Sequence, residues 1–202
     1  MITMEEARAA IGADDCFPSH IGWLRSYIER MPVDRDGHPI PWYTYASIDF
    51  LMRGRVKLDM TVFEYGCGNS TLWWAGKCKS VTAVDNSPVY VQRISDKAPV
   101  NVKLILQEEE NGYVCAINGK YDIICVDGIE KWRDRTLCVS PDFLKPDGVI
   151  ILDNSCDERY KYGVSDLHSL GFKQIDFWGF TPICTVGNCT SIFYRKENCF
   201  NI

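Results

Sequence analysis

A glycine-containing turn follows a strongly apolar run in the segment Val62–Thr71, which reads VFEYGCGNST. Gly66 and Gly68 can adopt backbone conformations that let a ligand approach closely, and the free N–H groups at the start of the next helix would face that ligand. Asp85 lies 21 residues after Glu64, at the end of the next apolar run, where its carboxylate can accept hydrogen bonds from both hydroxyls of a ribose. A glycine turn with an acid at this spacing predicts a nucleoside site.

The class of nucleoside follows from the residues around this turn. A dinucleotide-binding turn needs a third small residue three positions after its second glycine, where helix and strand close around a pyrophosphate, and Thr71 occupies that position. The carboxylate of Glu64 would repel a pyrophosphate but would attract a ligand that carries an ammonium and a sulfonium group. S-adenosylmethionine carries both groups. We therefore expect it here, and an NAD-dependent oxidoreductase is the weaker enzyme alternative.

With these motifs the chain resembles the class I S-adenosylmethionine-dependent methyltransferases over about residues 61–196. In that family a Glu-x-Gly-x-Gly turn after the first strand holds the methionine end of the cofactor, and an acid after the second strand holds the ribose. The cofactor contacts that the resemblance implies are Glu64, Gly66 and Gly68 at the methionyl end, Asp85 at the ribose, Asn86 at the adenine edge, and Gln107 or Glu108 near the adenine. Ser70 stands where the family often has a third glycine.

Two acids and an amide follow two later apolar runs. Asp127 ends the fourth run, and Asp153 and Asn154 end the fifth. The carboxyl ends of neighbouring parallel strands lie at one edge of a sheet, so we expect these side chains to face one cavity beside the cofactor. Methyl transfer needs an aligned nucleophile and the removal of its proton. Asp127, Asp153 and a desolvated Lys131 are therefore the candidate catalytic residues, and Asp127 is also a candidate cofactor contact.

Three oxygen ligands from Asp127, Asp153 and Asn154 would suit a hard cation such as Mg²⁺. The set resembles that of the catechol-type, divalent-cation-dependent O-methyltransferases, in which an Asp after the fourth strand and an Asp-Asn after the fifth hold the metal. Two interpretations stay open. Either these residues bind Mg²⁺, or Asp127 is a general base or cofactor-side hydrogen bonder while Asp153 and Asn154 cap the next helix.

Composition limits the substrate and the compartment. The 202 residues carry a net charge of −5 with no cluster of lysine or arginine, which disfavours a nucleic-acid substrate. The segment Val126–Ile129 also lacks the Asn/Asp-Pro-Pro-aromatic pattern of base-directed amino-methyltransferases. The absence of an apolar run of about 18 residues and the acidic N-terminus predict a cytoplasmic protein without a membrane partner. The ten cysteines are expected to be buried thiols, and their spacing does not fit zinc.

Alternating apolar runs and amphipathic stretches from residue 61 onward predict parallel strands joined by crossover helices. The expected strands are Val62–Tyr65, Ser80–Val84, Val102–Leu106, Tyr121–Val126, Val149–Leu152, Lys173–Phe177 and Thr190–Tyr194. The expected helices are Ser70–Gly76, Pro88–Lys97, Trp132–Phe143 and Asp157–Leu170. The last two strands are joined by a segment too short for a crossover helix and should be antiparallel. The predicted fold is α/β, a doubly wound seven-stranded, mostly parallel sheet with an antiparallel last strand.

Residues 1–60 show a different pattern. Helical patterns at Met4–Ile11, Ile21–Met31 and Tyr45–Arg55 flank a loop rich in Pro, Gly and Asp, in which His38 is the histidine nearest to a pocket. We expect an N-terminal helical cap over residues 1–60 and a core over residues 61–196, within one domain of residues 1–202. The identity of the acceptor depends on the loops at residues 30–45 and 178–190.

These observations predict an S-adenosylmethionine-dependent methyltransferase that methylates an oxygen of a small molecule, with the cap helping to cover the substrate. No nucleic acid is expected as a partner, and a homodimer is compatible with the sequence. A non-catalytic nucleoside-binding or scaffold subunit is the alternative from another functional class. Consumption of the cofactor would separate the two.

Overall fold

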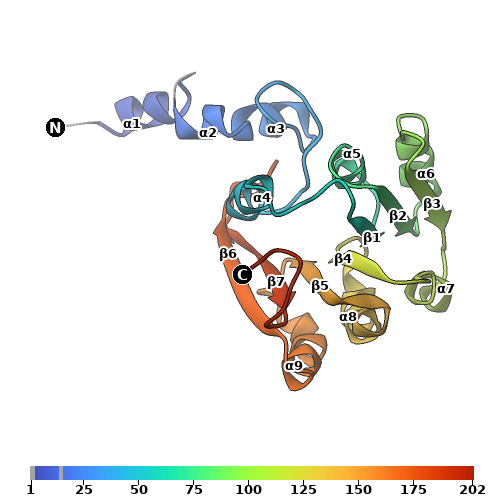
Figure 1. Ribbon diagram of the computed structural model, residues 1–202. Helices are drawn as coiled ribbons and strands as arrows, with labels where there is room; N and C mark the ends of the chain where they lie inside the picture. The colour runs from blue at the N-terminus through green and yellow to red at the C-terminus, as the bar shows by residue number, and fades with distance from the viewer. Residues whose placement is uncertain (1–2, 14–15) are drawn as a thin grey trace.

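The computed structural model describes residues 3–13 and 16–202, and its centre is a seven-stranded sheet (Figure 1). The strands are β1 (Thr61–Tyr65), β2 (Ser80–Asp85), β3 (Val102–Leu106), β4 (Tyr121–Val126), β5 (Leu144–Asp153), β6 (Lys173–Gly179) and β7 (Asn188–Tyr194). Their order is β3-β2-β1-β4-β5-β7-β6. Neighbours from β3 to β5 are parallel, whereas β7 is antiparallel to both β5 and β6. The predicted mostly parallel sheet with a reversed last strand is confirmed.

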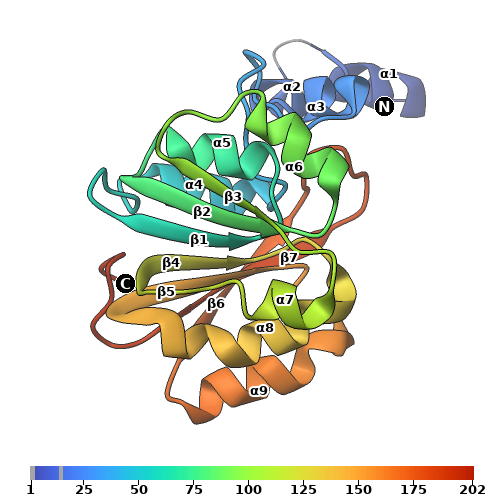
Figure 2. The ribbon, with the colours of Figure 1, turned by 90° about the vertical axis from the view of Figure 1, so that its right-hand side faces the viewer.

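Helices cover both faces of the sheet, as Figure 2 shows. One face carries α4 (Tyr45–Met52), α5 (Asn69–Ala75) and α6 (Pro88–Ser95), and the other carries α7 (Glu110–Val114), α8 (Arg133–Val139) and α9 (Lys161–Ser169). Successive residues of β4 alternate between two core clusters: Ile123 belongs to the cluster that contains Trp74 of α5, and Ile124 belongs to the cluster that contains Leu137 of α8. Because both faces are covered, the buried segments Ile123–Val126 of β4 and Val149–Leu152 of β5 are continuous apolar runs rather than alternating patterns.

The N-terminal helices lie partly outside this layered body. In Figure 1, α1 (Met4–Ile11), α2 (Phe17–His20) and α3 (Trp23–Glu29) form a row that projects from the sheet, whereas α4 packs against it. The indole Nε1 of Trp23 donates to the carbonyl oxygen of Cys184 over 2.7 Å, and the Tyr45 amide donates to the carbonyl oxygen of Phe180 over 2.9 Å. These bonds tie the N-terminal segment to the β6–β7 connection.

Several element boundaries differ from the sequence predictions for local reasons. The helix expected at Trp132–Phe143 consists of the 3-10 turn Glu130–Trp132, α8 and the 3-10 turn Ser140–Phe143, because Pro141 has no N–H with which to continue an α-helix. A third 3-10 turn, Glu158–Tyr160, precedes α9. The helix expected from Ile21 begins at Trp23 because Gly22 has a φ of +87°. The short helices α2 and α7 are not among the helices predicted from the sequence.

The ten cysteines differ in burial, and Cys16 and Cys184 are half-buried. Cys67, Cys78, Cys125, Cys189 and Cys199 are buried free thiols, as expected. Cys115, Cys138 and Cys156 are exposed, which corrects the expectation that all ten are buried. Among residues 3–13 and 16–202, no helix has both the length and the apolar character that crossing a bilayer requires.

Candidate active site

A cavity of about 640 Å³ opens at the carboxyl ends of β1, β2 and β4. Its walls come from the turns after these strands, from α6, from the segment that follows α3, and from the β6–β7 connection. The lining residues are Arg30, Met31, Pro32, Trp42, Gly66, Cys67, Gly68, Asn69, Ser70, Asp85, Asn86, Ser87, Tyr90, Arg93, Ile94, Asp127, Gly128, Ile129, Arg133 and Ile183. The glycine turn, the acid after β2 and the acid after β4 therefore share one cavity, as the sequence predicted.

The turn after β1 touches the turn after β4 through backbone alone. Gly66 has a φ of +96°, and a Cβ there would lie 2.6 Å from both the Cα and the N of Gly128. Gly128 has a φ of +67°, and a Cβ there would lie 2.6 Å from the hydroxyl oxygen of Tyr113. The Gly66 amide also donates to the carbonyl oxygen of Val84 over 2.7 Å. Only glycine satisfies both the conformation and the spacing at these positions.

Asp85 connects the turns that follow β1 and β2. Its Oδ2 accepts the Cys67 amide and its Oδ1 accepts the Ser87 amide, each over 2.8 Å. The residue is 7% exposed and lies in the cavity wall. A carboxylate has about four acceptor positions, so these two bonds leave one on each oxygen for a ligand diol.

Glu64 lies beneath the glycine turn, not in the lining of the cavity. It is fully buried, and its Oε2 accepts the hydroxyl of Thr71 over 2.5 Å, while Thr71 in turn accepts the Gly68 amide over 3.0 Å. Burial raises the pKa of Glu64 to about 8, although the neighbouring hydroxyls of Ser70 and Thr71 oppose the rise. Among the described residues nothing pairs with Glu64 Oε1 or with the buried hydroxyl of Tyr43. The glycine turn therefore packs over a buried acid whose Oε1 accepts no hydrogen bond from the described residues.

The three candidates at the ends of β4 and β5 are all bound by Arg133. Its Nη2 donates to Asp127 Oδ1 over 2.6 Å and to the Gly128 carbonyl oxygen over 2.9 Å. Its Nη1 donates to Asn154 Oδ1 over 2.6 Å and to the Asp153 carbonyl oxygen over 2.9 Å. Arg133 is 5% exposed, whereas the side chain of Asp127 is 23% exposed at the cavity. Sequence reasoning missed Arg133 because nothing local distinguishes it from an ordinary helix-surface arginine.

The sequence predicted that the carboxylate of Asp153 faces the cavity, but Asp153 is absent from the cavity lining. It is 4% exposed and accepts the hydroxyl of Thr190 over 2.8 Å. Burial, reinforced by the negative charge of Asp127, raises the pKa of Asp153 to about 8. Asp153 is thus a buried acid behind the cavity wall.

The oxygen donors of Asp127, Asp153 and Asn154 do not fit a magnesium ion. The guanidinium of Arg133 already occupies the point at which Asp127 Oδ1, Asn154 Oδ1 and the Asp153 carbonyl oxygen converge. A second cation at that point would be repelled at contact distance. The expectation of Mg²⁺ is therefore not supported.

Three other sequence candidates lie outside the lining of this cavity. The Gln107 amide donates to the Asp85 carbonyl oxygen over 2.9 Å, but the side chain of Gln107 lies against Gly112. Glu108 is absent from the lining. Lys131 is exposed, with its Nζ 4.9 Å from the ring centroid of Trp132.

The walls nearest to the N-terminal segment could not be foreseen in detail. The amide Nδ2 of Asn69, the first residue of α5, donates to the Pro32 carbonyl oxygen over 2.7 Å and holds the segment that follows α3 against the glycine turn. Ile183 has a φ of +72°, which is unusual for a β-branched residue, and its side chain lines the cavity. No sequence pattern signals such a conformation.

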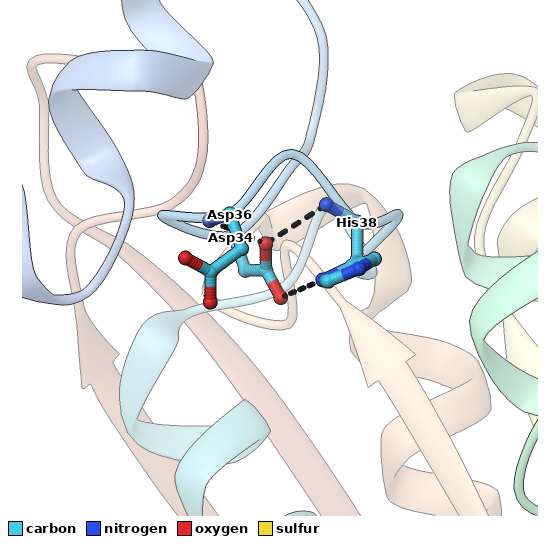
Figure 3. Close-up of side chains that lie close together, drawn as sticks. All are labelled: Asp34, Asp36 and His38. Atoms are coloured by element: carbon cyan, nitrogen blue, oxygen red, sulfur yellow. Dashed lines mark hydrogen bonds and ion pairs between the residues drawn. The ribbon is translucent and has the colours of Figure 1, made fainter.

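Asp34, Asp36 and His38 come together in the loop that precedes α4 (Figure 3). Asp34 Oδ1 accepts the amides of Asp36 and His38 over 2.9 and 2.8 Å, and Asp34 Oδ2 lies 3.2 Å from His38 Nδ1. The carboxylate of Asp34 is thus used to shape the loop. His38 lines a separate cavity of about 320 Å³, not the one at the glycine turn.

The strand order, the glycine turn after β1 and the acid after β2 define a class I S-adenosylmethionine-dependent methyltransferase fold. No family model matches the chain. Its sequence is similar to the ribosomal protein L11 methyltransferase of Thermosipho africanus, with 29% identity over 119 residues that cover 57% of this chain and 45% of that protein. The chain spans about half the length of the curated relatives it matches.

Solved structures support the same fold. The precorrin-6y C5,15-methyltransferase of Geobacter metallireducens matches with a TM-score of 0.60 and 14% identity, over 74% of this chain and 87% of that chain. A methyltransferase from Pyrococcus furiosus matches with a TM-score of 0.56 and 16% identity, over 95% of this chain and 99% of that chain. Sequence and fold therefore agree on the resemblance to class I methyltransferases.

Proposed function

We propose that this protein transfers a methyl group from S-adenosylmethionine to an oxygen of a small molecule. The observation that carries the proposal is Asp85, which anchors the turns after β1 and β2 and keeps free acceptor positions in the cavity wall. The cavity volume of about 640 Å³ lies within the range of sites that enclose a small ligand. The similarity to a methyltransferase in sequence supports the same activity.

The chain's own groups suit this cofactor. Asp85 would accept the ribose hydroxyls, Asn86 would meet the adenine edge, and the backbone of Gly66 and Gly68 would face the methionyl end. Glu64 Oε1 is an unpaired acceptor beneath the turn, and a cation bound above the turn would favour the ionised form of this acid. When bound, S-adenosylmethionine supplies an electrophilic methyl group on a sulfonium.

The remaining chemistry is the removal of a proton from the acceptor. Asp127 is the carboxylate in the cavity wall that is nearest to this role, because Asp153 is buried behind it. Burial raises the pKa of Asp127 while the Arg133 guanidinium opposes the rise, and a raised pKa makes a carboxylate a better base for a hydroxyl. We therefore assign Asp127 as general base for an alcohol or phenol.

The acceptor is proposed to lie between Asp127 and the N-terminal segment. Met31, Pro32 and Trp42 line the cavity from that segment, and Ile129 and Ile183 line it from the turns after β4 and β6. These apolar side chains favour a small acceptor with a carbon framework. A protein acceptor is the second candidate, since the curated relatives bear the name of ribosomal protein L11 methyltransferases.

Two measurements test the proposal. Calorimetric titration with S-adenosylhomocysteine should show micromolar binding, and titration with NADH should show none. S-adenosylhomocysteine formation should then be followed with a pool of small phenols and alcohols, with a purified ribosomal protein L11, and with a short RNA. Turnover with the small-molecule pool supports the proposal, and turnover with L11 alone supports the second candidate. The absence of cofactor binding would refute both, and binding without turnover in any arm would favour a scaffold subunit.

A further inference from the structure

We propose that Arg133 is a built-in cation that takes the place of a divalent metal at the ends of β4 and β5 and positions Asp127 in the cavity wall. The role in positioning rests on the function proposed above. The claim that Arg133 excludes a metal ion is independent of that function, because it concerns only the oxygen donors around the guanidinium. Arg133 is therefore a positioning residue for the reaction.

The guanidinium is held by four oxygens from two strand ends. Two are side-chain oxygens, Asp127 Oδ1 and Asn154 Oδ1, each at 2.6 Å. Two are carbonyl oxygens, those of Gly128 and Asp153, each at 2.9 Å. All are hard oxygen donors of the kind that bind Mg²⁺ or Mn²⁺. The guanidinium of Arg133 thus occupies a set of oxygen donors that could otherwise bind a metal cation.

The guanidinium differs from a metal ion in what it fixes. Its planar fork directs the N–H groups of Nη1 and Nη2 at separate acceptors, so Asp127 is held through one oxygen at 2.6 Å while its side chain is still 23% exposed to the cavity. Asn154 has a φ of +55°, an uncommon backbone conformation that is stabilised here by the bond from Arg133. Arg133 therefore fixes both the base and the backbone behind it.

The charges around the site also favour one cation and no more. Asp127 and Asp153 are the acids in contact with Arg133 or its bonded backbone, and the carboxylate of Asp153 is satisfied separately by Thr190. The Nε of Arg133 is buried and has no partner among the described residues. Arg133 lines the cavity but is only 5% exposed, so a metal ion that enters the donor set would have to expel the guanidinium.

Removal of the guanidinium should create a metal site. We would titrate wild type, Arg133→Met, Arg133→Lys and Arg135→Met with Mn²⁺ alone and follow free Mn²⁺ by electron paramagnetic resonance. Arg133→Met keeps an apolar stem for packing, and Arg135→Met removes the same charge from the exposed surface of α8, where Arg135 pairs with Glu110. We expect Arg133→Met to bind Mn²⁺ at least about tenfold more tightly than the other three proteins.

Two results would overturn the proposal. One is a wild type that itself binds Mn²⁺ with a Kd below about 1 mM. The other is a folded Arg133→Met protein that gains no affinity. The wild-type titration can still refute the proposal if the methionine variant does not fold. Neither measurement needs the cofactor or an acceptor. If methyl transfer is established, Arg133→Lys should keep more turnover than Arg133→Met, and Arg133→Met should shift the pH–rate profile. Equal losses with an unchanged profile would mean that Arg133 does not position Asp127.

Discussion

We predict that Asp85→Asn weakens cofactor binding, and the hydrogen bonds of Asp85 give the size of the loss. Asparagine keeps the shape but replaces one acceptor oxygen by an NH₂ group, which must then face the N–H of either Cys67 or Ser87. One of the two 2.8 Å bonds is lost, and the other is no longer assisted by charge. A hydrogen bond to a charged group contributes about 1.5–3 kcal/mol, so the turn itself is destabilised by about that amount.

The ribose loses interaction as well. One of its hydroxyls meets a donor instead of an acceptor, and the other meets a neutral oxygen. Together with the turn, we expect about 3 kcal/mol less binding free energy, which is about 100-fold in the Kd of S-adenosylhomocysteine. The melting temperature of the unliganded protein should fall by about 5 °C.

Calorimetry with S-adenosylhomocysteine and differential scanning calorimetry measure the two effects. The matched control is Asp59→Asn, which removes the same charge from an exposed acid and should leave both values unchanged. A cooperatively melting Asp85→Asn protein whose affinity is within about threefold of wild type, which is less than 1 kcal/mol, would refute the reasoning.

Three further predictions follow from buried or strained positions. Because burial raises the pKa of Glu64 from 4.5 to about 8 in the folded state, the contribution of this acid to stability is fully present below pH 4.5 and is lost as the pH rises through about 8. Glu64→Gln should therefore flatten the dependence of melting temperature on pH between these two values, and an unchanged slope would contradict this. Gly66→Ala should lower the free energy of unfolding in urea by several kcal/mol and abolish cofactor binding. The control is Gly119→Ala, which has a similar φ of +91° but no atom within 4 Å of its Cβ and should lose only about 1–2 kcal/mol. Equal losses in the two variants would show that crowding against Gly128 is unimportant. Ile183→Gly should leave the melting temperature unchanged or raise it by up to about 3 °C while lowering turnover, and a large fall in melting temperature would show that Ile183 serves packing instead.

Local sequence patterns predicted the sheet well because burial on both faces imposes it. The strands Val102–Leu106 and Tyr121–Val126 have the expected bounds, and the glycine turn and Asp85 share a cavity as expected. These features depend on neighbours in sequence or on strand periodicity. The shared cavity, for example, follows from the glycine turn after β1 and from Asp85 at the end of β2.

The rest of the site depends on residues distant in sequence. Arg133 is defined by its bonds to two strand ends, and no pattern around it distinguishes a buried ligand from a surface ion pair. The conformation of Ile183 depends on a turn that Trp23 anchors from the N-terminal segment, through its bond to Cys184. Two oxygens of the expected magnesium site, those of Asp127 and Asn154, do come together, but the Asp153 carboxylate faces Thr190 instead. The partner of the first two is the side chain of Arg133, which only the folded chain brings there.

The place of β7 in the sheet also sets an order for the synthesis of the protein. β7 is the last of the seven strands in sequence, yet it lies inside the sheet between β5 and β6. Until residues 188–194 leave the ribosome, β5 has a bare edge and β6 has no strand with which to pair, so both present unpaired N–H and C=O groups. Completion of the sheet therefore follows translation of Asn188–Tyr194, and a nascent chain stalled before Asn188 exposes unpaired strand edges, which are prone to aggregation.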